Sequence, residues 1–172
     1  EQGIVTNGNI SRDLLFFDED WPFGWRTDYE QLLALWPNAY EQGDFLVIEL
    51  GDLSRLEVYE QLIASAQMQK FRKMALERMA DFLQRVRNDQ PDHLLILSPT
   101  PRASQIAQGH LLTPLIYEVP HQKGLIRSAT TRRLGIIANL DLAPTVLKTM
   151  DLASPAFLAG SPWEIAENDE PY

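Results

Sequence analysis

The sequence contains no cysteine. The chain can therefore form no disulfide bond, and it offers neither a thiol nucleophile nor a cysteine ligand for a zinc or iron–sulfur site. Histidine is also scarce: the three are His93, His110 and His121, and no two of them have the H-x-x-x-H spacing of a helical metal site. A metal centre that depends on several histidines of this chain is therefore difficult to build.

Long apolar runs and an excess of positive charge are missing too. No run approaches the roughly 20 apolar residues of a transmembrane helix, so we expect no membrane span in this chain. Glu1-Gln-Gly does not resemble the start of a signal peptide, which leaves the compartment open. The absence of an initiator Met is typical of a mature or trimmed piece of a longer product. The formal net charge of −9 argues against nucleic acid as a partner, because phosphate binding favours clustered Lys and Arg.

What the chain does have is enough apolar sequence for a core. It has 172 residues, of which 45% are hydrophobic, and this suffices for one domain. We predict a single α/β domain or part-domain. An aromatic loop region with a short helix covers residues 1–43, an α/β core covers 44–160, and a loose tail covers 161–172.

The central segment shows a pattern of alternating strands and helices. Continuous apolar runs at Asp44–Leu50 and His93–Ser98 indicate buried strands. In the further apolar segment Leu111–Val119, Pro114 suggests a strand that begins late or lies at a sheet edge. Between the first two, a helical period extends from the capping box Ser54–Glu57 to about Asn88. Because strands separated by a long helix are typical of βαβ units, we predict a mostly parallel central sheet flanked by helices.

The first 43 residues are unusually aromatic. A packed loop with a short strand at Leu14–Phe17 is expected, followed by a helix from Asp28 to about Trp36 that Pro37 stops. The aromatic side chains serve either the core or the docking of another chain, such as a protein partner or a missing portion of the same protein.

Towards the end of the chain, an apolar segment, Leu134–Leu140, precedes a predicted helix from Asp141 to Met150. Asp141 is expected to cap the first turn, where Pro144 costs little. The motif N-x-D-x-A-P-T-V-L in this stretch resembles a late structural segment of the alkaline phosphatase superfamily, which includes sulfatases, nucleotide pyrophosphatases and cofactor-independent phosphoglycerate mutases. The longer T-T-R-R-x-G-I-I-A-N-L-D-L-A-P-T is similar to a bacterial branch of it. The resemblance covers about residues 44–160 and implies the later part of an alkaline-phosphatase-like fold, incomplete in this chain.

Dinuclear members of this superfamily hold two metal ions on Asp and His side chains at strand ends, and the resemblance implies where such ligands should stand. The family's D-x-x-x-H pair matches Asp52-Leu-Ser-Arg-Leu56, in which Leu56 replaces the His. The family's Asp-His pair after the next strand matches Pro99-Thr100, which offers no comparable ligand. His110 matches a third His position, before the segment Pro114-Leu-Ile116.

Asp52 and His110 are therefore the candidate metal ligands. Two ligands do not hold two ions, and no nucleophile segment is recognisable before residue 44. We accordingly expect no cofactor; the alternative is a divalent metal such as zinc or manganese whose remaining ligands lie outside this chain. A simpler explanation makes Asp52 a helix-start residue stabilised by the helix dipole and His110 an ordinary loop histidine.

Arg102, Arg132 and Arg133 are the candidate anion-binding residues. The adjacent guanidinium groups of the last two could clamp an anion, and Arg102 joins them if its loop folds over. The alternative role for the pair is a structural salt bridge with carboxylates of this acidic chain.

Three functions stay open at this point. The preferred one is an alkaline-phosphatase-like domain with a degenerate metal site that acts as a non-catalytic binding or scaffolding module. The alternative is a metal-dependent hydrolase or phosphotransferase of phosphate or sulfate esters, completed by residues outside the chain. The third is a generic α/β domain that binds a partner through its aromatic N-terminal region.

Overall fold

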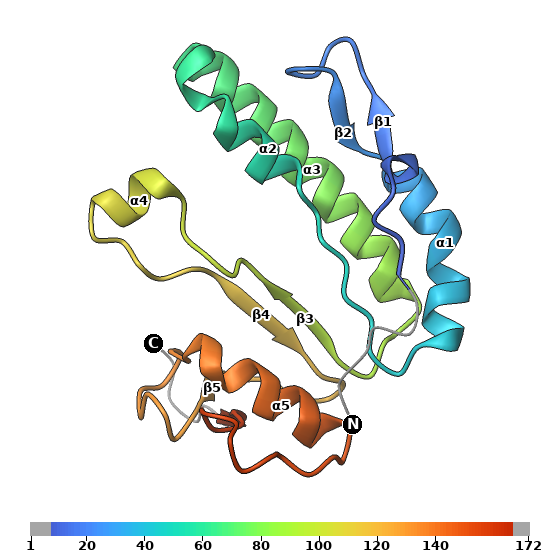
Figure 1. Ribbon diagram of the computed structural model, residues 1–172. Helices are drawn as coiled ribbons and strands as arrows, with labels where there is room; N and C mark the ends of the chain where they lie inside the picture. The colour runs from blue at the N-terminus through green and yellow to red at the C-terminus, as the bar shows by residue number, and fades with distance from the viewer. Residues whose placement is uncertain (1–7, 167–172) are drawn as a thin grey trace. The chain divides into compact units, whose positions relative to one another are not determined.

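The structure is a computed structural model, and it describes residues 8–166. The chain divides into two compact units with the boundary between Pro91 and Asp92, inside the predicted 44–160 core. The first unit contains η1 (Arg12–Leu14), β1 (Leu15–Phe17), β2 (Trp25–Thr27), α1 (Tyr29–Gln42), α2 (Asp52–Val58), η2 (Glu60–Leu62) and α3 (Ser65–Asn88). The second contains β3 (Leu94–Leu97), α4 (Ala103–Ala107), β4 (Leu115–Glu118), β5 (Leu125–Arg127), η3 (Asn139–Asp141), α5 (Leu142–Thr149) and β6 (Glu164–Ala166) (Figure 1). We call them unit 1 and unit 2.

The sheets are small and antiparallel, so the prediction of a mostly parallel, alkaline-phosphatase-like central sheet is wrong. Within the described residues, β1 pairs with β2, β3 with β4, and β5 with β6, each pair antiparallel. β3 and β4 fall where the sequence predicts strands, and Leu95 lies opposite Tyr117. The expected burial of the first of these strands is wrong, because its first three residues are only partly buried and Leu97 is 36% exposed. An apolar run does not encode strand direction either. The connection through α4 returns the chain directly alongside β3 instead of crossing over.

The segment Asp44–Leu50 is not the buried strand that its sequence predicts. It has no regular secondary structure. Ile48 and Leu50 pack against the helical core of unit 1, whereas Phe45 and Val47 are mostly exposed. Part of the apolar run therefore serves contacts with helices, which a strand pattern does not distinguish from contacts within a sheet.

α3 carries the core of unit 1. Its N-terminal half contributes Met68, Phe71 and Ala75 to one cluster, together with Trp21 and Leu56. Its C-terminal half contributes to a second cluster, which consists of Tyr29, Trp36, Phe82 and Val86. The helical period predicted for this region is confirmed, because the periodic apolar positions of α3 point into these two clusters.

The helix boundaries in unit 1 differ from the predicted ones. α1 begins after Asp28, whose carboxylate accepts from the backbone N–H of Gln31, and it continues through Pro37 to Gln42. The single long helix predicted from Ser54 is two helices, because the chain leaves the helix at Tyr59 and begins α3 at Ser65. The packing of Trp36 in the core and its stacking on Tyr40 outweigh the hydrogen bond that Pro37 cannot make.

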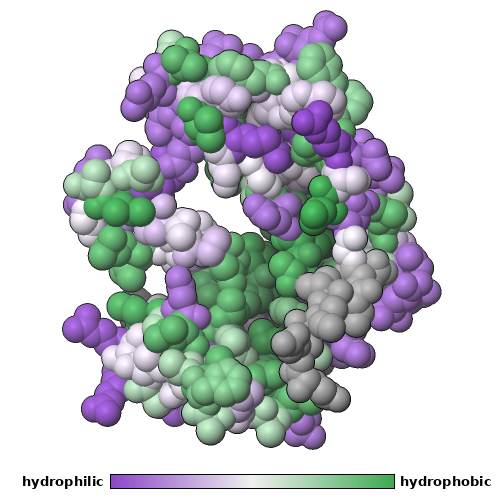
Figure 2. All heavy atoms as spheres, viewed as in Figure 1, coloured by the Kyte–Doolittle hydropathy of each residue, from purple (hydrophilic) through white to green (hydrophobic). Residues whose placement is uncertain are grey.

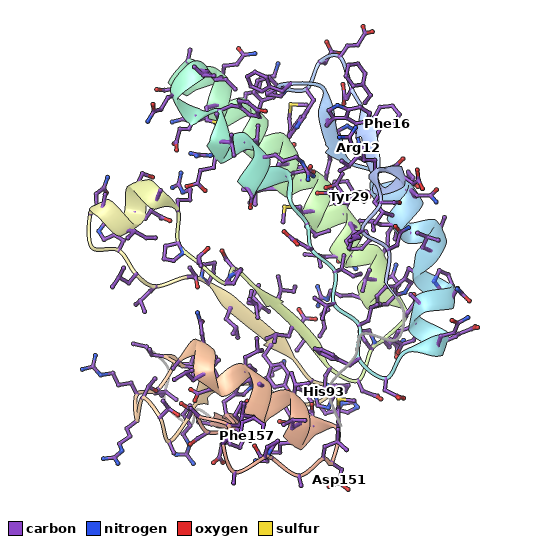
Figure 3. The ribbon with its side chains drawn as sticks, in the orientation of Figure 1. Arg12, Phe16, Tyr29, His93, Asp151 and Phe157 are labelled. Carbon is purple, nitrogen blue, oxygen red and sulfur yellow. The ribbon has the colours of Figure 1, made fainter. Side chains whose placement is uncertain are left out.

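Unit 2 includes part of the predicted tail. β6 pairs with β5, and the preceding Trp163 is buried with its ring edge-on to Tyr117 at 5.6 Å. The prediction of a loose tail is therefore wrong for β6, while residues 167–172 lie outside the described residues, as do 1–7 at the other end. Phe157, by contrast, is 88% exposed and does not dock (Figure 3).

α5 confirms the helix predicted for this region, with Pro144 in its first turn. The apolar segment before it, Leu134–Leu140, contains a turn and the start of η3. None of the helices within residues 8–166 combines the length and the hydrophobicity that crossing a bilayer requires.

Candidate functional site

Asp52 is the first residue of α2, and its side chain is fully buried in unit 1. Thr27 donates to one carboxylate oxygen twice, from its backbone N–H at 2.7 Å and from its hydroxyl at 3.0 Å. The guanidinium of Arg55 donates to the same oxygen at 2.7 Å, and the hydroxyl of Tyr29 donates to the other oxygen at 2.8 Å. The chain itself therefore supplies four donors to Asp52, three of them to one carboxylate oxygen and one to the other.

These contacts decide the charge of the buried groups. Burial on its own would raise the pKa of Asp52, but the hydrogen bonds from Thr27, Arg55 and Tyr29 outweigh it and lower that pKa below its ordinary value. Burial and the adjacent carboxylate raise the pKa of Tyr29, so this phenol stays protonated and remains a donor. Figure 3 shows Tyr29 in the interior of unit 1 beside α3. Asp52 is therefore ionised, its charge is balanced by Arg55, and both of its carboxylate oxygens accept hydrogen bonds.

Leu56 stands where the family resemblance implies a metal-binding histidine. It is 1% exposed and packs in the cluster that contains Trp21 and Phe71. The two positions that would hold metal in a D-x-x-x-H pair are thus used for a buried ion pair and for apolar packing. The charge that a metal ion would bring to Asp52 comes from Arg55.

The second candidate ligand, His110, lies in unit 2. It is exposed in the loop between β3 and β4, and its backbone N–H donates to the carbonyl of Gln105 at 2.9 Å. Asp52 belongs to unit 1, so the two candidate ligands share no site within either unit. No group of three His, Asp or Glu side chains within residues 8–166 is placed to hold a metal ion.

The loop after β3 also contains Pro99 and Thr100, which occupy the family's Asp-His positions. The hydroxyl of Ser98 donates to the carbonyl of Thr100 at 3.1 Å, and the amide of Asn139 donates to the carbonyl of Pro99 at 3.2 Å. Both contacts tie down backbone oxygens. The first lies within the loop, and the second fastens the loop to the segment that leads into α5.

The three arginine candidates lie in unit 2. Arg132 and Arg133 are exposed in the turn after β5, and neither guanidinium forms an ion pair with another residue of the described range. The predicted alternative of a structural salt bridge for this pair therefore has no partner within residues 8–166. Arg102 immediately precedes α4, on the loop after β3, and is half-buried. Pro99 of the same loop accepts a hydrogen bond from Asn139 of η3.

Asp141 plays a part that the sequence did not predict. It is fully buried, yet its carboxylate does not cap α5. It accepts instead from the hydroxyls of Ser128 and Thr130 and from the backbone N–H groups of Ala138 and Ser161. The expectation of a simple cap is wrong, because the segments on either side of α5 supply better donors than the helix does.

This second buried carboxylate resembles the first in its electrostatics. Burial would raise the pKa of Asp141, but its hydrogen bonds with Ser161, Thr130, Ala138 and Ser128 outweigh burial and lower the pKa. No cation contacts it within the described residues, so the four donors alone stabilise the charge. Asp141 thus fastens the turn after β5 to the start of α5. The serine and threonine content of Ser128–Thr131 is the one signal that could have indicated this network.

Two shallow depressions are present in the described surface, and neither is formed by the candidate residues. One lies along α3 between Gln69 and Ala80, and the other lies between the end of α5 and Pro162. In comparisons with known proteins, no family model, no curated protein and no solved structure matches this chain. The interpretation of the candidate sites therefore rests on the geometry of this chain alone.

Proposed function

We propose that this chain is a non-catalytic binding or scaffolding module. The observation that carries the proposal is the state of Asp52: its carboxylate is buried, is paired with Arg55, and accepts hydrogen bonds from Thr27 and Tyr29. To bind this fully buried carboxylate, a metal ion would have to enter a network in which Arg55 already supplies the positive charge. Leu56, in the core, supports the same conclusion for the paired ligand position.

Exposed apolar side chains support the binding part of the proposal. Val58 and Leu62 in unit 1 are each 75% exposed, and Leu112 in unit 2 is 74% exposed. Single exposed apolar residues are ordinary, but groups of them often mark contact surfaces. Figure 2 shows such hydrophobic surface over several parts of the molecule.

The proposal is tested by metal analysis and ester hydrolysis on the full chain. We expect no stoichiometric zinc or manganese after purification with these metals present, and no turnover of aryl phosphate or aryl sulfate esters above the buffer rate. Stoichiometric metal together with turnover, both lost in Asp52→Ala while the fold is retained, would establish the metal-dependent hydrolase instead.

A further inference from the structure

The charge of this acidic chain is unevenly distributed. Residues 93–140 contain a single carboxylate, Glu118, and five cationic side chains, which gives this segment a net charge of +4 in a chain of −9. The five cations are Arg102, Lys123, Arg127, Arg132 and Arg133. Arg127 lies 3.9 Å from the carboxylate of Glu164, whereas Arg132 and Arg133 are exposed in the turn after β5. Such an asymmetry between parts of one chain indicates a surface suited to an anionic partner.

The same segment carries exposed apolar side chains on a loop. Between β3 and β4, Ile106, Leu111 and Leu112 are 48%, 66% and 74% exposed. Gly109 adopts a φ of +79°, which favours glycine and turns the chain just before the two leucines. Figure 2 shows the hydrophobic surface of the loop that bears α4. This loop therefore presents adjacent leucines to its surroundings without a carboxylate nearby in the sequence.

The apolar loop and the arginine turn belong to one end of unit 2. The loop after β3 and the turn after β5 both lie on the side where α5 begins (Figure 1). The hydrogen bond from Asn139 to Pro99 and the bond from Thr130 to Asp141 fix the two segments to the same short stretch before α5. The apolar and cationic features are thus held by one framework.

We propose that this end of unit 2 docks on the surface of an anionic phospholipid membrane, an inference that rests on the binding function proposed above and names its partner. Exposed leucines supply apolar area for the interface, and Arg132 and Arg133 supply positive charge for the phosphate headgroups. Weak membrane contacts become stable when these two kinds of signal are combined. The negative charge elsewhere on the chain opposes binding only slightly, because salt screens charges that are more than about 8 Å apart.

Flotation of the full chain with phosphatidylcholine vesicles, with and without phosphatidylserine, tests the inference. We expect binding that requires phosphatidylserine and weakens as salt is raised. The double variants Leu111→Ser/Leu112→Ser and Arg132→Gln/Arg133→Gln should each lower the binding roughly tenfold or more. Matched controls in unit 1, Phe45→Ser/Val47→Ser and Lys70→Gln/Lys73→Gln, remove exposed apolar and cationic side chains in equal number and should leave binding unchanged.

Other outcomes overturn the inference. If the chain bound vesicles with and without phosphatidylserine equally well, the arginines would have no role in binding. If the control variants lost as much binding as the test variants, this end of unit 2 would not be the binding surface. If the chain bound no vesicles but was captured by immobilised polyglutamate, the partner would be an acidic polypeptide and not a lipid surface. Because metal content and ester turnover are measured separately, failure of membrane binding leaves the non-catalytic proposal standing.

Discussion

Arg55 lies one helical turn after Asp52 in α2, and its guanidinium donates to the Asp52 carboxylate at 2.7 Å. The same guanidinium nitrogen donates to the hydroxyl of Thr27 at 2.7 Å, so the pair joins α2 to the end of β2. This carboxylate, which the sequence resemblance makes a candidate metal ligand, forms a structural contact between two elements of unit 1. Asp141 has the corresponding role in unit 2, where its carboxylate joins the turn after β5 to the start of α5.

Replacing Asp52 by Asn should destabilise unit 1 and should have no effect on metal binding. The neutral amide leaves Arg55 without its counter-charge and places N–H groups against the donors of Thr27 or Tyr29. We expect a loss of about 3 kcal/mol in the free energy of unfolding, measured by urea titration. Asp81→Asn, on the exposed face of α3, is the matched control. A loss no larger than that of the control would contradict the structural role of Asp52.

Replacing Asp141 by Asn should loosen unit 2 selectively. Four donors converge on this carboxylate, and an amide cannot accept from all of them, so we expect a loss of about 3 kcal/mol. Hydrogen exchange followed by mass spectrometry should show faster exchange in the turn after β5 and in α5, with α3 unchanged. If the exchange rates of the variant equalled those of the wild type in both units, Asp141 would not hold this region together.

Introducing histidine at Leu56, the residue that the sequence resemblance implies there, should not create a metal site. Leu56→His places an imidazole at a position that is 1% exposed, so this substitution should lower the free energy of unfolding by about 3 kcal/mol. Val58→His, two residues further along α2 and 75% exposed, should have little effect. Zinc binding gained by the Leu56 variant and absent from the Val58 variant would point to a latent metal site instead.

Acid should destabilise the chain from about pH 4 downwards. The pKa values of Asp52 and Asp141 are both lowered in the folded chain, because their hydrogen bonds outweigh burial. The unfolded chain therefore takes up protons first. The stabilisation is fully present above the ordinary aspartate pKa and is lost as the pH falls towards the lowered values. Urea midpoints between about pH 6 and pH 3 should fall less steeply in each single Asp→Asn variant than in the wild type, and identical slopes would exclude these two groups as the source.

Local structure could be predicted from the sequence more successfully than its assembly. The helical period of α3 places Phe71, Ala75 and Phe82 in the core, and the apolar runs at β3 and β4 are strands as expected. The helical period reports burial correctly, whereas the apolar runs overstate it for β3 and β4, which are at most partly buried. Neither pattern reports strand direction, so the sheet expected to be parallel is antiparallel.

For the candidate site, the sequence likewise identified the residues but not their contacts. The sequence identified Asp52 and the substituted position Leu56, and both lie in the interior of unit 1. It could not identify the partners of Asp52, because Thr27 and Tyr29 come from a strand and a helix far away in the sequence. For the same reason the sequence neighbours of Asp141 predict a cap, although Ser128 and Ser161 reach this carboxylate through the fold.

The most direct test of the structural role of Asp52 is equilibrium unfolding of the wild type and Asp52→Asn, each with and without saturating zinc or manganese. A metal that binds the native site must raise the free energy of unfolding. We predict that neither metal changes this free energy in the wild type and that Asp52→Asn lowers it equally under all conditions. A metal-dependent stabilisation of the wild type that disappears in Asp52→Asn would show that Asp52 is a ligand and would contradict the non-catalytic proposal.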